Sequence, residues 1–589
     1  MLATQLTIAQ PKRVRVIRPE QPKQTRYAWL IRKLNEQYAV GDIAEASRSI
    51  LRILDELGAE HRPPSPKVNA EVSQAIHAAL SVMTQADFRI PENHANGYLF
   101  HVSTIANALA AATDATSDAW RASVAGDKQE AFKACLLSSP REMTPFPFGR
   151  LMDAAPDLAS AWFCQAFKTA FAGNVCERTR KNLIELARSL DDRFVQCKDM
   201  QEPYFLVTYL GDDEAERNVK FHINNAIKRN AIDIRPGKRS KIVAVASDNW
   251  MPGHSVWRTL KGYIDALRPE YELVLLHSHR DAAVLDKEGF SETIKIPHDG
   301  THTDLSVLHD RGFCGLIVPD VGMTGWSIAL ANHRVAPVQV MMTGHPVSTF
   351  GSEIDYFLCG EDMTPESQNY YSEKLVRVPG FGAIHEEPTY QPRGTPKDYD
   401  GIIINCSWYG QKVTAEWVKF VGQIVKATGK KVKLHVFAGG AATGRSGFSP
   451  FLRAFDKQLD GVEAELFPHL DYPEYMAQLE RGDFAVDCFP FAGSNTVSDN
   501  LHLRKPVVCL EGRRWFNRIG PAMLRSCGLA KLVAHDNEEF ESVLSCMIKN
   551  DTFRENMITQ ARNTDLGFKV YARRGALEFA QWFRDQVAS

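Results

Sequence analysis

The spacing of apolar residues changes near residue 240, and this change constrains the fold more than any other feature of the sequence. Before it, apolar residues recur at the spacing of one helix face. This pattern predicts helices at 27–40, 45–58, 73–83 and 181–190. Strand-like alternation is nearly absent there, and no segment recurs at a fixed period, which argues against a solenoid. We therefore expect an irregular all-α domain over residues 1–238.

After residue 240, short β-branched runs alternate with helical stretches. KIVAVASD (241–248) predicts a strand, HSVWRTLKGYIDAL (254–267) a helix and YELVLLHSH (271–279) another strand. The same alternation starts again at GIIINCSWYG (401–410). It predicts two doubly wound α/β domains in tandem, at 239–395 and 396–565. The apolar spacing of the last segment predicts an amphipathic terminal helix within 566–589.

The charge balance argues against several classes of partner. Lys and Arg number 69 and Asp and Glu 71, so the net charge of -2 supplies no general field for nucleic acid or an anionic membrane. No window is long and apolar enough for a membrane span, and the basic first residues lack the apolar core of a signal peptide. We expect these first residues, 1–26, to form a disordered tail. The eleven cysteines lack zinc or disulfide spacing and fit reduced thiols in the cytoplasm.

Polar residues and glycines follow several of the predicted strands. Asp248 and His254 follow the first strand of the first α/β domain, and Gly344 with His345 follows another. Lys412 follows the first strand of the second domain. Ligands of open α/β sheets bind outside the carboxyl ends of the strands. We therefore expect a ligand in a cleft between the two domains.

FPFAGSNTVSD (489–499) places a small-residue turn and four polar residues where a helix should begin. A helix start has unpaired N–H donors and partial positive charge, which favour phosphate oxygens. Gly493 lets the backbone approach a ligand closely. Asp499 lies one turn into the helix, and its negative charge suits a sugar hydroxyl or another hydrogen-bond donor better than a phosphate. The four residues are Ser494, Asn495, Thr496 and Asp499. The alternative is an ordinary N-cap, which needs only Ser494.

A nucleotide diphosphate fits this helix start because Lys412 could neutralise it from the same predicted cleft. The nearby loop 437–447 resembles a phosphate-binding P-loop, but Arg445 replaces its lysine and a strand precedes it in the domain, so we reject that interpretation. GDDE (211–214) and the pair His298 and His302 are weak metal signals. We expect no metal and no other cofactor.

Three stretches carry a resemblance to a known family: GHPVSTFGSEIDYF (344–357), YYSEKLVRVPG (370–380) and HLDYPEYMAQLERGDFAVDCFPFAGSNTVSD (469–499). In this order they resemble the family-41 glycosyltransferases, which include O-GlcNAc transferase and the bacterial adhesin N-glucosyltransferases. The similarity spans about residues 241–565, with motifs in both α/β halves. The helical first domain resembles the bacterial branch, not a tetratricopeptide array.

The resemblance implies a GT-B fold: two Rossmann-like lobes facing across a cleft after the all-α domain, with the terminal helix crossing back to the first lobe. It implies that His254 faces the reacting centre and that Lys412 binds the diphosphate of a UDP-sugar. It also implies further donor-binding positions, including a residue beside the uracil and a loop that closes over the sugar and diphosphate. These are His469, Asn495, Thr496, Asp499, Gly344 and His345.

The resemblance further implies inverting, metal-independent transfer of a hexose, glucose by preference, to asparagine in Asn-x-Ser/Thr sequons of polypeptides such as adhesins. In the N-glucosyltransferases a glutamine of the glycine loop lies near the donor sugar; here the position is Ala441, which leaves the choice between glucose and an N-acetylated sugar open. The alternatives are O-linked N-acetylglucosamine transfer to Ser or Thr, an epimerase, or a UDP-sugar-binding protein of the same architecture.

Overall fold

The structure is a computed structural model, which describes residues 27–60, 62, 65–113, 116–124, 128–168, 176–238, 240–439 and 449–588. The tail predicted to be disordered (1–26), Ala441 and Arg445 lie outside the described residues. The chain divides into two compact units. The first contains Met1–Leu186, Trp408–Gln423 and Val432–Leu470, and the second contains Ala187–Ser407, Ile424–Lys431 and Asp471–Ser589. The domain boundaries expected from the sequence stay predictions.

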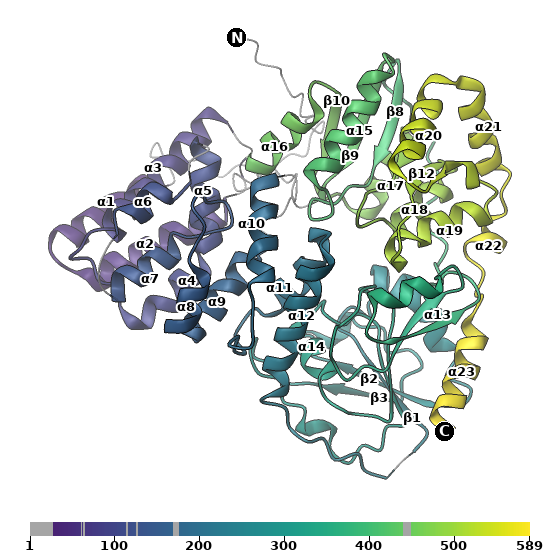
Figure 1. Ribbon diagram of the computed structural model, residues 1–589, viewed down its shortest axis with the longest axis horizontal. Coiled ribbons are helices and arrows are strands. Elements are labelled where there is room, and N and C mark those ends of the chain that lie inside the picture. The colour runs from purple at the N-terminus through teal and green to yellow at the C-terminus, as the bar shows by residue number, and fades with distance from the viewer. Residues whose placement is uncertain are drawn as a thin grey trace. The chain divides into compact units, whose positions relative to one another are not determined.

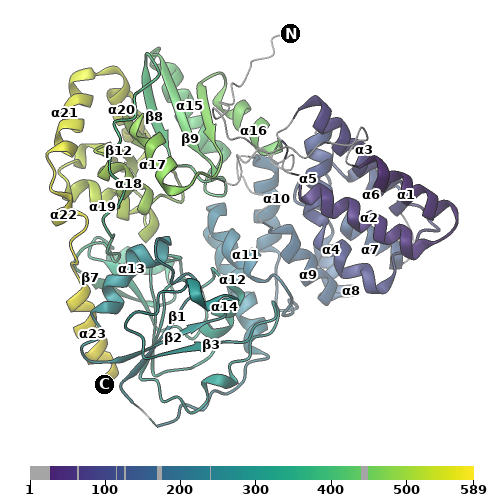
Figure 2. The same ribbon diagram turned by 180° about the vertical axis from the view of Figure 1, so that it is seen from behind.

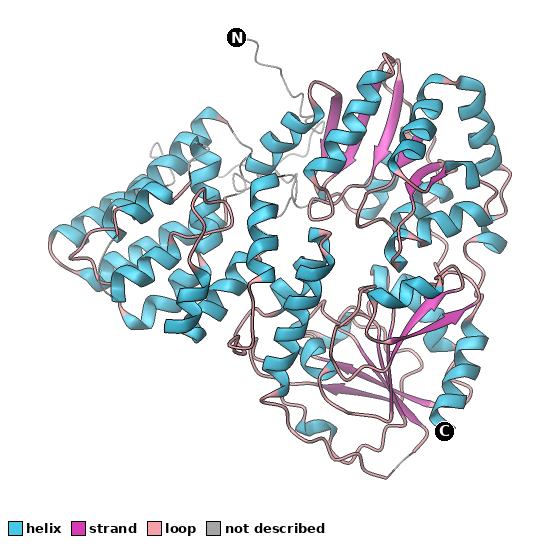
Figure 3. Cartoon of the chain, viewed as in Figure 1, coloured by secondary structure: helices cyan, strands magenta, loops and turns pink. Residues whose placement is uncertain are grey.

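Every regular element described between residues 27 and 238 is helical, as Figure 3 shows. The helical spacing in the sequence is confirmed: α2 buries Ile50, Ile53 and Leu54 on one face, and the Asp42 carboxylate caps it by accepting from the Glu45 N–H. The helices are α1 (Ala28–Ala39), α2 (Ile43–Gly58), α3 (Pro66–Met83), α4 (Ala95–Phe100), α5 (Val102–Thr113), α6 (Asp118–Ala122), α7 (Lys128–Leu136), α8 (Phe148–Ala154), α9 (Pro156–Ala166), α10 (Glu177–Arg188), α11 (Gln201–Leu206) and α12 (Asp213–Lys228).

The first sheet has seven parallel strands in the order β3-β2-β1-β4-β5-β6-β7. Its central strands are buried along their length, as parallel sheets covered on both faces require. The strands are β1 (Ile242–Ala246), β2 (Glu272–His277), β3 (Glu292–Lys295), β4 (Gly315–Val318), β5 (Val338–Met341), β6 (Tyr356–Gly360) and β7 (Lys374–Val378), with helices α13 (Ser255–Asp265) and α14 (Gly325–Ala331). This sheet forms the first Rossmann-like lobe.

The second sheet has six strands in the order β10-β9-β8-β11-β12-β13, and its described pairings are parallel. The strands are β8 (Ile402–Cys406), β9 (Val432–Phe437), β10 (Glu463–Phe467), β11 (Phe484–Val486), β12 (Val507–Leu510) and β13 (Val533–Ala534). The helices among them are α15 (Ala415–Ala427), α16 (Ser449–Leu459), α17 (Tyr472–Glu480), α18 (Asn495–His502), α19 (Ile519–Ser526), α20 (Asn537–Lys549) and α21 (Asp551–Arg562).

The chain ends with α22 (Leu566–Lys569) and α23 (Ala576–Ala588). α23 returns to the first lobe and lies along its sheet in both ribbon views (Figures 1 and 2). Phe579 and Phe583 are fully buried there, edge-on to Tyr263 and Tyr271. A Cβ added to Gly315 of β4 would come within 2.3 Å of Phe583 Cζ, so this strand needs glycine to admit the ring.

A buried ion network joins α12 to loops of both α/β halves of the second unit. The Glu216 carboxylate accepts from Lys220 Nζ at 2.7 Å and from the Arg514 guanidinium, which also contacts Asp213. Lys220 donates further to the Ser348 carbonyl at 3.0 Å. Glu216 and Lys220 are almost wholly inaccessible to solvent, so each charge depends on its partners. The acidic GDDE segment therefore serves α12, where Asp212 caps the helix and Asp213 pairs with Arg514.

We predict that Phe583→Ala lowers the free energy of unfolding by about 3–5 kcal/mol, because it empties a close-packed site between α23 and β4. The matched control is Leu577→Ala in the same helix, where the side chain is 77% exposed and the loss should stay within about 0.5 kcal/mol. Urea unfolding followed by tryptophan fluorescence measures both. Equal midpoints for the two variants would contradict the anchoring of α23.

Candidate functional site

The loop after β11 shapes the start of α18. The Asp487 carboxylate Oδ1 accepts from the Cys488 N–H at 2.8 Å and the Gly493 N–H at 2.9 Å. A Cβ on Gly493 would lie 1.9 Å from Thr496 Oγ1, so another residue there would force the Thr496 side chain out of its place. The strand-end residue Asp487 therefore folds the loop back, and glycine lets Thr496 sit against it.

Ser494 does not cap α18 with its side chain, which makes the ordinary N-cap alternative wrong. Its Oγ instead lies 2.9 Å from Nε2 of His385, a fully buried histidine from the loop after β7. The Asn495 amide oxygen is buried, with no hydrogen-bond partner among the described residues. Because the first N–H groups of a helix also lack partners within it, this end of α18 keeps polar groups for a ligand.

Asp499, one turn into α18, meets another donor. Its Oδ1 accepts from the Tyr472 hydroxyl at 2.7 Å and from Arg258 Nη2 at 3.0 Å. Arg258 also lies over the Tyr472 ring, 4.9 Å from its centre. Burial raises the pKa of the Asp499 carboxyl group, and Arg258 and Tyr472 oppose that shift by stabilising the carboxylate. This cluster joins α13 of the first lobe to α17 and α18 of the second half of the chain.

His254 begins the same helix that carries Arg258. It is the N-cap of α13, and its Nδ1 accepts from the Val256 N–H at 3.2 Å. Burial lowers the pKa of His254, so the ring is neutral near pH 7. With Nδ1 accepting, the neutral ring carries its hydrogen on Nε2. His254 is therefore set to donate a hydrogen bond from Nε2, and it is poorly set to take a proton there.

Gly344 and His345 follow β5. A Cβ on Gly344 would lie 2.6 Å from the Pro319 carbonyl oxygen, so glycine is needed where these two loops touch. The His345 side chain is buried: Nδ1 lies 3.0 Å from the Val321 carbonyl, and the ring packs on Phe205 with centres 4.8 Å apart. Burial lowers the pKa of His345 to about 3, so it is neutral near pH 7. The donor contact expected of this loop stays a prediction.

Lys412 lies after a strand, as the sequence predicts, and His469 follows a strand that was not predicted from the sequence. Lys412 follows β8, and its N–H donates to the Tyr409 carbonyl at 2.8 Å. His469 is exposed and follows β10. Both belong to the first unit and α18 belongs to the second, so their meeting at one ligand stays a prediction. The contact expected of Ala441 lies outside the described residues.

No group of three His, Cys, Asp or Glu residues that could hold a metal is found in the described part of the chain. His298, one of the weak metal signals, bonds within its own turn, with Nδ1 at 3.0 Å from Thr303 Oγ1. Within the described residues, no helix is long and apolar enough to cross a membrane.

Sequence reasoning missed three residues that organise this site: Arg258, His385 and Tyr472. A weak signal existed for each. Arg258 is one turn beyond His254, Tyr472 lies within the stretch that carries the family resemblance, and His385 follows a strand. Their partners could not be read from the sequence, since Arg258 and Asp499 are 241 positions apart.

We predict that Arg258→Met destabilises the protein by about 3–5 kcal/mol, because it leaves the Asp499 carboxylate buried without its charge partner. The double variant Arg258→Met with Asp499→Leu should recover much of that loss, since neither charge then remains buried. Urea unfolding of the two single variants and the double variant completes the cycle. Losses that simply add would contradict the pairing of these two residues.

We predict that acid weakens the protein partly through His385. Burial lowers the pKa of His385 to about 3, with Arg258 adding to the shift, against 6.5 for an ordinary histidine. Between these values the unfolded chain binds a proton that the folded chain does not, so stability falls as pH falls from 6.5 toward 3, by about 2 kcal/mol at pH 5. We expect His385→Gln to reduce the pH dependence of the free energy of unfolding by the equivalent of about one proton bound on unfolding. Unfolding midpoints measured across pH test this. Above pH about 7.5 the two curves should run parallel; an unchanged slope below 6.5 would contradict the assignment.

No family model matches the chain, but individual proteins do. It is 26% identical over 350 residues to a UDP-glucose:protein N-beta-glucosyltransferase of Actinobacillus pleuropneumoniae serotype 5b, a match that covers 55% of each chain. It is 27% identical over 221 residues to a probable UDP-N-acetylglucosamine–peptide N-acetylglucosaminyltransferase SPINDLY of Hordeum vulgare, covering 36% of this chain and 23% of that one. The chain thus spans about half, or less, of the length of these relatives.

A solved structure resembles nearly the whole chain. A mutant O-GlcNAc transferase of Thermobaculum terrenum matches with a TM-score of 0.56 and 17% identity, over 96% of this chain and 99% of that one. This match confirms the predicted fold class: two Rossmann-like sheets of the GT-B type after a helical N-terminal region. Together with the sequence relatives, it confirms the resemblance that the motifs predict, and the chain is similar to the family-41 glycosyltransferases.

Proposed function

We propose that the protein is a UDP-sugar-dependent protein glycosyltransferase, which transfers a hexose, glucose by preference, to asparagine in Asn-x-Ser/Thr sequons. The observation that carries this is the start of α18, where the Ser494 side chain is diverted to His385 and the buried Asn495 amide oxygen has no described partner. The names of the relatives add the donor and acceptor classes. A cytoplasmic location belongs to the same proposal.

In this proposal the helix start and Lys412 stabilise the departing diphosphate. Backbone N–H groups, the Thr496 hydroxyl and the Lys412 ammonium group stabilise the negative charge that develops on UDP. The proposed mechanism therefore requires no metal. Asn495 accepts a hydrogen bond from the nucleotide, and His469 lies beside the uracil. Gly344 and His345 belong to the loop that closes over the donor.

The chemistry is inverting transfer. The acceptor side chain attacks the anomeric carbon from the face opposite UDP, the bond from that carbon to the phosphate oxygen breaks, and the acceptor loses one proton. His254 orients the acceptor by donating from Nε2, because its Nδ1 is held by the Val256 N–H. It is a positioning group in this scheme, and the final proton acceptor is solvent or buffer.

O-linked transfer of N-acetylglucosamine to Ser or Thr is the second candidate function. The SPINDLY relatives favour it, since their names specify UDP-N-acetylglucosamine as the donor. One experiment separates the two candidates: mass spectrometry of an Asn-x-Thr peptide after incubation with UDP-glucose or UDP-N-acetylglucosamine in EDTA. Added hexose on asparagine supports our proposal, and N-acetylhexosamine on threonine supports the alternative. If calorimetry shows that UDP binds but no peptide is modified, the remaining alternatives are a UDP-sugar-binding protein and an epimerase.

We predict that Lys412→Ala and Asn495→Ala each lower turnover by about 10²–10³-fold, the usual effect of removing one donor that stabilises developing negative charge or of disturbing the site that holds it. Arg445→Ala is the control and should stay within about threefold, because we reject a P-loop at that position. Initial rates with saturating peptide and UDP-glucose measure all three. An inactive Arg445→Ala beside an active Lys412→Ala would overturn the site assignment.

A further inference from the structure

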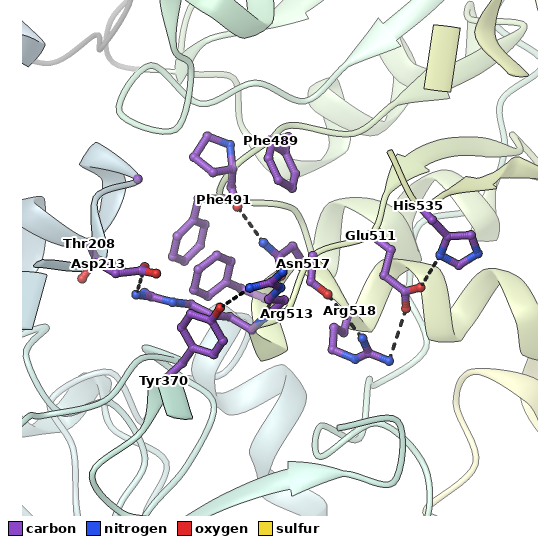
Figure 4. Close-up of a pocket in the computed structure, with 15 residues that line it drawn as sticks. Thr208, Asp213, Tyr370, Phe489, Phe491, Glu511, Arg513, Asn517, Arg518 and His535 are labelled. Carbon is purple, nitrogen blue, oxygen red and sulfur yellow. Dashed lines mark hydrogen bonds and ion pairs between the residues drawn. The ribbon is translucent and has the colours of Figure 1, made fainter. Parts of the chain in front are cut away.

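A pocket of about 490 Å³ opens beside the loop that shapes the start of α18 (Figure 4). Two strand-end loops form most of it, the loop after β11 and the loop after β12, and all of its lining residues belong to the second unit. Tyr370 of the first lobe, residues between Thr208 and Asp213, and His535 after β13 complete the wall. Its size is within the usual range for ligand sites.

Aromatic side chains line this pocket, and contacts within the protein hold two of them against each other. Phe491 stacks on Phe516 with ring centres 4.2 Å apart and planes 10° from parallel. Asn517 ties the two loops together, because its Nδ2 donates to the Pro490 carbonyl at 3.1 Å and its Oδ1 accepts from the Arg514 N–H at 3.0 Å. We call this the aromatic pocket, lined by Tyr370, Phe489, Pro490, Phe491 and Phe516.

The charges around the aromatic pocket are arranged in pairs. Arg514 contacts Asp213 and Glu216, while Glu511 meets His535 at 3.1 Å and Arg518 at 3.4 Å. The exposed Arg513 donates to the Tyr370 hydroxyl at 2.9 Å. Among the described residues, Arg514 and Arg518 have carboxylate partners and Arg513 has none within salt-bridge distance, so the pocket carries only a small positive charge, which is weak for holding a second nucleotide or another polyanion. Its chemistry suits an uncharged aromatic or bulky apolar group.

We propose that the aromatic pocket takes a bulky apolar or aromatic side chain of the acceptor polypeptide. This inference rests on the proposed function and adds a specificity site to it. Phe491 lies four residues before Asn495, so the pocket wall and the proposed donor site are at most about 15 Å apart along the chain. An extended peptide covers that distance in about four or five residues. The anchoring side chain therefore belongs within about five residues of the modified asparagine.

The test uses the full chain and Asn-x-Thr peptides that carry Trp or Ala three, four or five residues from the asparagine, on either side. We expect KM for at least one Trp peptide to be about tenfold below that of its Ala partner, with kcat within about twofold, because the burial of an aromatic side chain acts on binding. Tyr370→Ala should reduce this preference to about threefold or less. Calorimetry with UDP checks that the variant keeps its donor site.

The matched control is Phe568→Ala, which removes an aromatic ring that is 58% exposed and lies outside the pocket; it should keep the full preference. Equal KM values for all Trp and Ala peptides would overturn the inference and leave the proposed transfer intact. So would a preference that survives Tyr370→Ala unchanged. Wild-type protein that modifies none of the peptides would overturn the proposed function, and the acceptor pocket with it.

Discussion

The contact between Arg258 and Asp499 holds the candidate site together. Both groups are largely withdrawn from water, so the attraction between them must offset a desolvation penalty that a surface pair would not meet. Two features lower that penalty: the Tyr472 hydroxyl also donates to the carboxylate, and the Tyr472 ring lies beneath the guanidinium. Because His254 caps the helix that carries Arg258, the same pair sets where His254 lies relative to the start of α18.

A second buried network repeats this principle on another side of the unit. Glu216 and Lys220 are one turn apart on α12, and they reach Arg514 after β12 and the Ser348 carbonyl after β5. Burial lowers the pKa of Lys220, while the Glu216 carboxylate opposes that shift. One helix thereby fixes loops from both α/β halves. Arg514 also lies in the loop that walls the aromatic pocket, so α12 supports the pocket as well as the fold.

Most of the fold could be predicted from the sequence because buried parallel strands are short apolar runs, whereas helices place apolar residues every three or four positions. Three strands gave no such signal in the sequence and were not predicted: β3, β10 and β13. β3 and β10 lie at sheet edges with mostly exposed or half-buried residues, and β13 has only two residues, so none forms an apolar run. The start of α18 could also be predicted, because its glycine and polar residues are local sequence signals. The alternative that the Ser494 side chain caps the helix was wrong. The partner of Ser494, His385, lies 109 positions away, and only tertiary packing could select it.

The histidines of the first lobe constrain how charge can be handled in the proposed reaction. Burial lowers the pKa of His254, His345 and His385, so these three imidazoles are neutral near pH 7 and supply no positive charge. Arg258 is already committed to Asp499. At the start of α18 these four side chains therefore supply no free positive charge, and a diphosphate bound there would depend on the helix N–H groups, with Lys412 as the counter-charge that our proposal adds. This distribution suits a reaction limited by departure of UDP, in which a neutral His254 orients the acceptor without competing for the negative charge.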